Sequence, residues 1–243
     1  MSSCSRVALV TGANKGVGFA IARDLCRRFS GDVVLTARDE ARGRAAVQQL
    51  QAEGLSPRFH KLDITDLQSI RTLRDFLRRE YGGLNVLVNN AGIAFESDDP
   101  TPFDIQAELT MKTNFFATRS VCTELLPIMK PHGRVVNISS LQGSKALEDC
   151  SEDLREKFRC ETLSEGDLVD LMKKFVEDTR NESNQEGDLP STDSFRKSPP
   201  QLELSQTKVR NQELELSLPH GWLGHRCCLS RHMSRSRAVW TQT

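Results

Sequence analysis

The sequence predicts a doubly wound α/β fold, in which a parallel sheet is covered by helices on both faces and is truncated after its fifth strand. Two observations predict it. Over residues 6–140, short β-branched runs alternate with longer segments of helical periodicity. A turn with three glycines, Gly12, Gly16 and Gly18, joins the first run to the first helical segment. Such a junction aims backbone N–H groups and the positive end of a helix at one spot, which suits a phosphate.

Each element has its own signal in the sequence. The expected strands are residues 7–10, 32–37, 57–62, 85–90 and 133–140. The expected helices are residues 17–29, 39–53, 66–80 and 103–129, the last one broken near Pro127. The first strand is wholly apolar, as in a strand buried on both faces, whereas residues 57–62 alternate and suit an edge. Asp66 is the expected N-cap of the third helix.

The change of pattern along the chain divides it into three segments. Residues 1–143 form the expected dinucleotide-binding domain, residues 144–182 a helical insertion in that domain, and residues 183–243 an atypical, largely disordered tail. In the insertion, Ser151 and Ser164 are expected to begin two helices. The second helix carries an apolar stripe that we interpret as packing rather than ligand contacts: Leu168, Leu171, Met172, Phe175 and Val176.

Charge and cysteine content argue against several classes of protein. The 243 residues contain 33 Lys plus Arg and 33 Asp plus Glu, so net charge favours neither nucleic acid nor an anionic membrane as a partner. The seven cysteines are scattered, none at zinc-site spacing, and we expect no metal site. Without a signal peptide or an apolar run of about 20 residues, the chain is expected to be cytoplasmic with reduced cysteines.

The glycine turn is the first candidate site. Its spacing, Gly-x-x-x-Gly-x-Gly, has a longer first gap than the common dinucleotide fingerprint. We expect the turn to bind the phosphates of a dinucleotide cofactor through Gly12, Asn14, Lys15, Gly16, Val17 and Gly18.

The charge after the second strand distinguishes between two cofactors. A dinucleotide fold that prefers NAD places an acid there, to bind the ribose 2′-hydroxyl. Here the strand runs into Arg38, with no acid before Asp39. An arginine fork suits a phosphate dianion, so we expect NADP (NADPH), with Lys15 and Arg38 on its 2′-phosphate. The alternative is that Arg38 and Arg42 are solvated surface charges.

Further motifs follow in order. Residues 89–92 (Asn-Asn-Ala-Gly) come after the fourth strand, residues 112–114 (Lys-Thr-Asn) lie in the long helix, and residues 136–140 (Val-Asn-Ile-Ser-Ser) end the fifth strand. With Thr11 before the glycines and Asp63 after the third strand, they resemble the short-chain dehydrogenase/reductase family. Residues 5 to about 182 look most like its cytosolic, monomeric NADPH-dependent carbonyl reductases, which carry a similar helical insertion. The resemblance implies a Rossmann fold.

The resemblance also implies a reaction. In the family, hydride passes from NADPH to the carbonyl carbon of an aldehyde, ketone or quinone, a serine binds the carbonyl oxygen, and a tyrosine donates the proton. Ser140 would be that serine, and Asn114 would support a water relay. Ser139 is expected on the other side of the strand, because strand side chains alternate. The remaining residues implied to contact the cofactor are Asp63, Ile64, Asn90, Ala91 and Gly92.

One part of the family pattern is missing. The family requires Tyr-x-x-x-Lys after the serine, but the only tyrosine of this chain, Tyr81, precedes it. Near the corresponding places the chain has Ser194 and Ser198, with Lys197 beside the second. A serine hydroxyl is a far weaker acid than a phenol, so we expect the activity of this chain to be impaired.

Two interpretations of the whole chain follow. It is either a carbonyl reductase-like oxidoreductase of impaired activity, or a non-catalytic splice or frame variant that only binds NADP(H) or associates with partners. The family implies a monomer, but a sheet that ends at its fifth strand leaves an open edge through which copies could associate. Our hypothesis for the tail is an alternative exon or a shifted reading frame from about residue 183.

Overall fold

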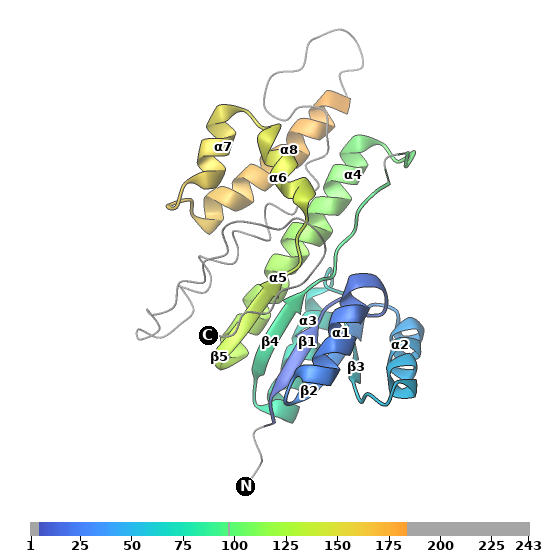
Figure 1. Ribbon diagram of the computed structural model, residues 1–243. Helices are drawn as coiled ribbons and strands as arrows, with labels where there is room; N and C mark the ends of the chain where they lie inside the picture. The colour runs from blue at the N-terminus through green and yellow to red at the C-terminus, as the bar shows by residue number, and fades with distance from the viewer. Residues whose placement is uncertain (1–4, 97, 184–243) are drawn as a thin grey trace.

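The computed structural model describes residues 5–96 and 98–183 and contains one parallel, five-stranded sheet (Figure 1). The strand order is β3-β2-β1-β4-β5. The strands are β1 (Val7–Val10), β2 (Asp32–Ala37), β3 (Arg58–Lys61), β4 (Leu84–Asn89) and β5 (Met129–Asn137). The order reverses direction between β1 and β4, which confirms the predicted doubly wound arrangement.

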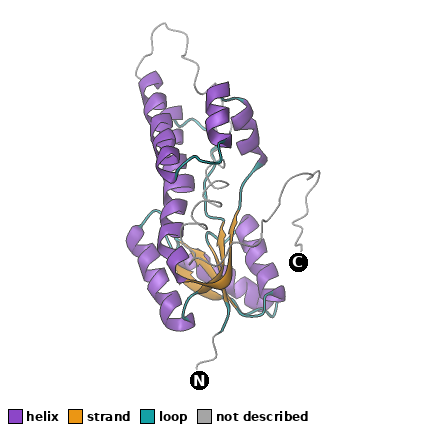
Figure 2. Ribbon diagram, turned by 90° about the vertical axis from the view of Figure 1, so that its left-hand side faces the viewer, coloured by secondary structure: helices purple, strands orange, loops and turns teal. Residues whose placement is uncertain are grey.

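Helices cover both faces of this sheet (Figure 2). The first face carries α1 (Gly16–Arg28) and α2 (Glu40–Ala52), whose apolar residues pack with Ala8 and Val10 of β1. The opposite face carries α3 (Leu67–Tyr81) and α5 (Thr118–Leu125), which pack with Val7 and Leu9. All four residues of β1 are 0% exposed, as expected for a central strand that is apolar throughout.

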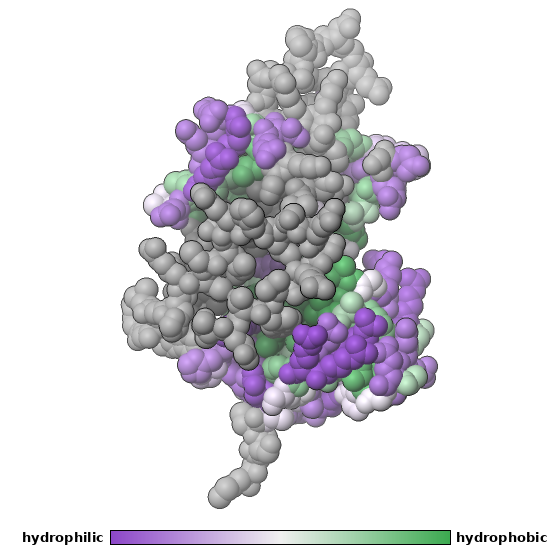
Figure 3. Space-filling view, viewed as in Figure 1, coloured by the Kyte–Doolittle hydropathy of each residue, from purple (hydrophilic) through white to green (hydrophobic). Residues whose placement is uncertain are grey.

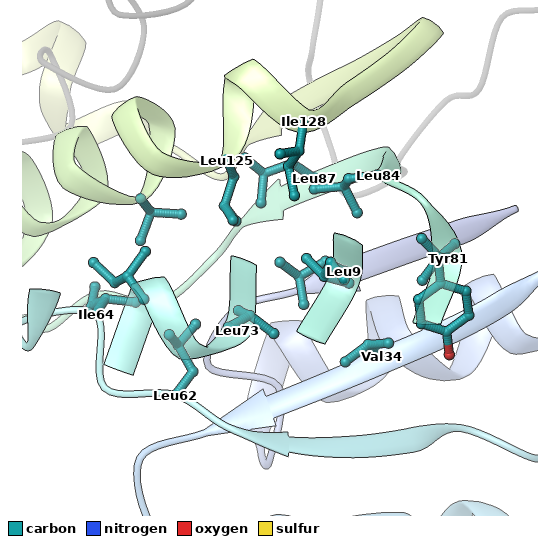
Figure 4. Packing of buried hydrophobic residues seen from close by; sticks show 14 of the residues in the cluster. Leu9, Val34, Leu62, Ile64, Leu73, Tyr81, Leu84, Leu87, Leu125 and Ile128 are labelled. Carbon is teal, nitrogen blue, oxygen red and sulfur yellow. The ribbon is translucent and has the colours of Figure 1, made fainter. Parts of the chain in front are cut away.

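The cluster on the second face shows how the pattern of α3 becomes a core. Its residues Ile70, Leu73 and Leu77 are fully buried, and Figure 4 shows Leu73 beside Leu9 and Val34 of the sheet. Asp66 caps this helix as predicted, because its carboxylate accepts a hydrogen bond from Gln68 N at 2.9 Å. Gly82, at φ 69°, ends the helix in a left-handed conformation that glycine adopts without strain.

The long helix predicted for residues 103–129 is present but composite. It consists of α4 (Phe103–Thr110), a π-helical segment η1 (Met111–Ala117), α5, and a 3₁₀ turn η2 (Leu126–Ile128) that contains Pro127. The break near Pro127 is confirmed. The π-helical segment was not predicted, because apolar periodicity does not distinguish i→i+4 from i→i+5 hydrogen bonding over two turns.

The fifth strand differs most from its predicted range of residues 133–140. It begins at Met129 and ends at Asn137. His132 takes a φ of 63°, and a register irregularity between Leu84 and Val86 lets Met129 pair with β4 before the kink. At the other end, the chain leaves the sheet and enters the helix α6 (Leu141–Glu148), so residues 138–140 form the connection.

The helical insertion builds a second core. Beyond α6 it contains α7 (Glu152–Arg159) and α8 (Glu165–Ser183), whose apolar residues pack on α4, η1 and α5. The predicted caps are confirmed, since Ser151 Oγ accepts from Leu154 N and Ser164 Oγ accepts from Asp167 N. Of the predicted stripe on α8, Leu168, Met172 and Phe175 are buried, and Leu171 and Val176 pack partly buried against the same cluster.

The last strand, β5, has one described neighbour in the sheet. Within residues 5–96 and 98–183, β5 pairs with β4 alone, and Val136 on it is 38% exposed. In Figure 3, apolar surface lies beside the hydrophilic surface over α1 and α2. Our expectations for the tail, with Ser194, Lys197 and Ser198, concern positions outside the described residues. None of the described helices is both long and apolar enough to cross a membrane.

Candidate active site

The site predicted from the sequence lies at the carboxyl edge of the sheet. The strands are parallel, so the loops that follow them emerge at one edge. The glycine turn follows β1, Arg38 follows β2, and Asp63 and Ile64 follow β3. Residues 90–92 follow β4, and Ser140 follows β5. The strand order therefore places Arg38 and Asp63 at one end of the edge and Ser140 at the other.

The three glycines of the turn answer three different requirements. Gly12 and Gly16 have positive φ values of 62° and 58°, which favour glycine. A Cβ on Gly12 would lie 2.8 Å from Ala91 Cα, and one on Gly18 would lie 2.3 Å from Asn90 Nδ2. A Cβ on Gly16 would meet no described atom within 4 Å. Gly12 and Gly18 are thus required by the loop after β4, while Gly16 borders open space.

The start of α1 fits a phosphate. Lys15 is its N-cap residue in an extended conformation, and no side chain among the described residues caps this end of the helix. Lys15, Gly16 and Val17 are exposed, Val17 by 61%, and Asn14 is half-buried. The first N–H groups of α1 therefore keep the uncompensated positive end that a phosphate complements. This local geometry supports the residues predicted for the turn.

Thr11 and Asn90 fasten the glycine turn to the loop after β4. Thr11 Oγ1 accepts hydrogen bonds from Asn90 N at 2.9 Å and from Ala91 N at 3.0 Å. In return, Asn90 Nδ2 donates to the main-chain oxygens of Thr11 and Gly12, both at 3.0 Å. Sequence reasoning used Thr11 only as a neighbour of the glycines. Its role as a double acceptor depends on residues about 80 positions away, so no local pattern reveals it.

Asn114 lies in the π-helical segment and reaches the same loop. Its Oδ1 accepts from Ile93 N at 2.9 Å, and its Nδ2 donates to Ile93 O at 2.8 Å. The residue is 6% exposed, and a Cβ on Gly92 would lie 3.2 Å from Asn114 Oδ1. The structure thus brings Asn114 to residues 92–93, where its side chain shapes the loop; the water relay stays a prediction.

Ser140 and its neighbours lie where the chain passes from β5 to α6. Ser140 is exposed, and its main-chain oxygen accepts from Gly143 N at 3.3 Å. Ser139 is exposed as well, so exposure does not separate the two hydroxyls. Asn89 and Asn137 were named in the sequence analysis only as members of their motifs. In the structure they are joined, because Asn89 Nδ2 donates a hydrogen bond to Asn137 Oδ1.

The basic residues predicted for the 2′-phosphate differ in their surroundings. Lys15 and Arg38 are exposed, and neither forms a salt bridge with any carboxylate of the described residues. Arg42 instead lies beside Asp39, with Nε 4.0 Å from Oδ2 and its main-chain N bonded to Oδ1. Lys15 and Arg38 are therefore available to a ligand phosphate, whereas Arg42 belongs to the first turn of α2.

Asp63 and Ile64 form an ordered turn at the end of the site. Asp63 Oδ1 accepts from Thr65 N at 2.9 Å and from Thr65 Oγ1 at 2.7 Å, and Asp63 N donates to Ser69 Oγ. Ile64 is 8% exposed and belongs to the core cluster under α3. Asp63 is thus held by its own turn, and the side chain of Ile64 faces the core.

The single tyrosine lies away from this edge. Tyr81 is the last residue of α3, three residues before β4 begins, so it lies at the amino edge of the sheet. It is 4% exposed, and Figure 4 shows it at the opposite end of the core cluster from Ile64. Burial raises the pKa of its phenol, an effect that Arg58 opposes. No cluster of three metal-ligating side chains occurs within the described ranges.

A glycine turn suited to a phosphate, at the switch point of a doubly wound sheet, is typical of dinucleotide-binding α/β proteins. Comparison with known sequences gives the family: the profile described as short chain dehydrogenase matches residues 6–151. The chain belongs to the short-chain dehydrogenase family.

Relatives and solved structures agree with that assignment. Carbonyl reductase (NADPH) 3 of Mus musculus is 84% identical over 192 residues, which cover 79% of this chain and 69% of that protein. Carbonyl reductase (NADPH) 1 of Homo sapiens is 71% identical with the same coverage. Salutaridine reductase from Papaver somniferum superposes with a TM-score of 0.71 at 26% identity, covering 84% of this chain and 79% of that one. A metagenomic short-chain oxidoreductase in complex with NADP gives a TM-score of 0.50 at 34% identity, covering 58% and 66%.

Proposed function

We propose that the chain is a carbonyl reductase-like oxidoreductase that binds NADPH and whose reduction of aldehydes, ketones or quinones is impaired. The observation that supports impaired reduction is that the single tyrosine of the sequence, Tyr81, is buried at the amino edge of the sheet. The names of the similar carbonyl reductases and the uncapped start of α1 support the cofactor.

The proposed cofactor site uses residues that follow the first four strands, β1 to β4. The turn of Gly12, Asn14, Lys15, Gly16, Val17 and Gly18 would hold the phosphates, with Lys15 and Arg38 on the 2′-phosphate. Asp63 would border the adenine, with Ile64 beside it as a further cofactor contact, and Asn90, Ala91 and Gly92 would contact the other half of the molecule. When bound, NADPH supplies the hydride for a carbonyl carbon.

The protein side of the reaction is incomplete in this proposal. Ser140 would donate a hydrogen bond to the carbonyl oxygen and stabilise the charge that develops on it. Completion also requires a proton for that oxygen, and an aliphatic hydroxyl is too weak an acid to supply it efficiently at neutral pH. The Tyr-x-x-x-Lys pair that would do so is absent from the sequence after Ser140.

A second candidate function is association without catalysis. The supporting observation is β5, which within the described ranges is the last strand of the sheet and exposes Val136. In this alternative the chain is a non-catalytic splice or frame variant that binds NADP(H) or joins a partner through that edge. As compartment we propose the cytoplasm, which the unbridged thiols of Cys26 and Cys150 support.

One experiment separates these possibilities. NADPH binding to the purified full chain is measured by calorimetry, and oxidation of NADPH by a quinone is then followed in the same sample. Binding without turnover supports the proposal. Turnover that Ser140→Ala abolishes would show that another proton donor serves, and would contradict the impairment. Absence of binding, with Gly18→Ala as the site-disabled control, would contradict the cofactor assignment.

A further inference from the structure

Two side-chain amides tie the ends of β4 and β5 together. Asn89 is the last residue of β4, Asn137 is the last of β5, and the two are paired in the parallel register. Asn89 Nδ2 donates a hydrogen bond of 2.9 Å to Asn137 Oδ1. The main chain closes the same junction, since Ile138 N donates to Asn89 O at 2.9 Å. The two strand ends are therefore joined both by side chains and by main chain.

A thiol on α5 fixes the orientation of the first amide. Asn89 Nδ2 also donates toward Cys122 Sγ at 3.4 Å. Asn89 is 2% exposed and Cys122 is 1% exposed, so water does not compete for the contact between these two residues. An amide nitrogen carries two N–H groups, and here one is directed at an oxygen and the other at sulfur. A flipped amide would set the oxygens of Asn89 and Asn137 against each other, which is unfavourable in a buried place.

The residues that follow this junction form the reaction side of the candidate site. Asn89 runs directly into Asn90, Ala91 and Gly92, and Ser140 lies three residues after Asn137. The strand order places both loops on the β4–β5 side of β1, whereas Arg38 and Asp63 follow β2 and β3 on the other side. The hydrogen bond between Asn89 and Asn137 thus constrains the loops that we assign to the nicotinamide and the carbonyl group. It does not constrain the loops assigned to the adenosine.

We propose that Asn137, held by Asn89, whose amide in turn contacts Cys122, positions Ser140 against the loop of residues 90–92 for the nicotinamide half of NADPH. This inference rests on the proposed cofactor. Asn137 is a positioning residue, because it acts through the main chain of β5 and through Asn89. Loss of the Asn137 side chain therefore weakens binding of the nicotinamide half of the cofactor more than binding of the adenosine half.

Two ligands distinguish the nicotinamide half of the cofactor site from the adenosine half. NADPH contains both halves, and adenosine 2′,5′-bisphosphate contains the adenosine and the 2′-phosphate without the nicotinamide. Asn137→Val removes the acceptor oxygen and keeps a side chain suited to a strand. By calorimetry on the full chain, this variant is expected to bind NADPH about tenfold more weakly, because the acceptor for Asn89 is lost, with bisphosphate affinity unchanged.

The matched control is an asparagine on β4, the strand of Asn89, at the opposite edge of the sheet. Asn85 Oδ1 accepts a hydrogen bond from Val7 N at 3.0 Å and so ties β4 to β1 at the amino edge. Asn85→Val is expected to lower the thermal midpoint of unfolding without changing the ratio of the two affinities. A purely structural role for Asn137 would make its variant behave like this control.

Hydrogen exchange of the ligand-free chain provides a second readout. Asn137→Val is expected to speed amide exchange in residues 90–93 and 138–143 and to leave residues 12–18 unchanged. Asn137→Asp keeps an acceptor oxygen for Asn89 and is expected to exchange like the unvaried chain. The inference is overturned if Asn137→Val weakens both ligands equally, if it leaves NADPH binding unchanged, or if exchange rises equally in residues 12–18. Failure of the unvaried chain to bind NADPH would overturn the proposed function, while the exchange pattern would still decide whether the tie positions the two loops.

Discussion

Arg58 donates a hydrogen bond from Nη1 to the hydroxyl oxygen of Tyr81 at 2.8 Å, and this contact joins the edge strand β3 to the end of α3. The guanidinium also lies over the rings of Phe76 and Tyr81, 5.2 and 5.5 Å from their centroids. The phenol is therefore part of the packing at the amino edge, on the side of the sheet away from Ser140.

This surrounding gives a pH prediction. Burial raises the pKa of Tyr81 above its ordinary value of about 10, because the phenolate is disfavoured in the core. Its contribution to stability is then complete below the unfolded pKa and is lost as the pH rises through the folded pKa. Since the chain has one tyrosine, the ultraviolet absorbance of tyrosinate reports this group alone. The titration midpoint of the native chain is expected above that of the denatured chain. Tyr81→Phe is expected to abolish the tyrosinate signal but not NADPH binding. A titration midpoint of the native chain at or below that of the denatured chain would contradict the burial of Tyr81.

A second prediction concerns Gly18. A methyl group there would lie 2.3 Å from Asn90 Nδ2 and 2.7 Å from Gly12 O, so Gly18→Ala forces the two loops apart. We expect it to lower the free energy of unfolding by about 1–3 kcal/mol and to abolish NADPH binding. Gly166→Ala is the control, because that helical glycine has no neighbour closer than 3.6 Å. The control is expected to stabilise the chain by up to about 1 kcal/mol in urea unfolding; equal effects of the two variants would speak against the clash.

Asn114 gives a third prediction. Asn114→Ala removes both hydrogen bonds to Ile93 and leaves the main-chain groups of Ile93 partly buried without these partners. We expect a loss of about 2–3 kcal/mol of unfolding free energy and weaker NADPH binding. Gln106→Ala is the matched control, since Gln106 Nε2 also bonds a main-chain oxygen, that of Thr101 at 2.8 Å, within the same stretch of chain. If both variants weaken NADPH binding alike, Asn114 has no special role in shaping residues 90–93.

The cofactor preference is tested through three cations. Lys15→Ala and Arg38→Ala are each expected to weaken NADPH binding about tenfold or more, because each removes a charge-assisted contact to the 2′-phosphate. Neither change should alter the affinity for NADH, which lacks that phosphate. Arg42→Ala serves as control, since Arg42 lies beside Asp39. A loss of NADH binding as large as that of NADPH would mean that the two residues act on the fold instead.

Association through the sheet edge is tested at Val136. A lysine on an edge strand disfavours pairing with another chain, so Val136→Lys is expected to shift the population toward monomer in sedimentation velocity. Leu67→Lys is the control, because Leu67 is an apolar residue of similar exposure, 44% against 38% for Val136, but lies on α3. A chain that sediments as a monomer before any substitution, with a cooperative thermal transition, would contradict the predicted association.

Much of the fold could be predicted because its signals are local. The range of residues 7–10, the cap at Asp66 and the stripe on α8 each depend on residues a few positions apart, and all three are confirmed. Strand periodicity does not show where a strand leaves its sheet. The end of β5 depends on where β4 stops and on the kink at His132, so the predicted range was displaced by several residues.

The candidate site divides in the same way. The glycine turn and the motif of residues 89–92 are visible as short patterns, and the fold brings them together. What holds them is visible only in three dimensions, since the contacts of Thr11 with Ala91 and of Asn89 with Asn137 join residues 80 and 48 positions apart. No spacing rule finds such pairs in a single sequence.

The glycine turn has one further consequence. Two of its three glycines are required by contact with another loop of the same protein, since a side chain on Gly12 or Gly18 would collide with Ala91 or Asn90. A descendant of an enzyme that had stopped using its cofactor would still need both residues in order to fold. Conservation of Gly12 and Gly18 in such a lineage would therefore reflect the needs of the fold rather than cofactor binding. In a pseudoenzyme only Gly16, which borders open space, could be replaced, by other residues that tolerate its backbone conformation.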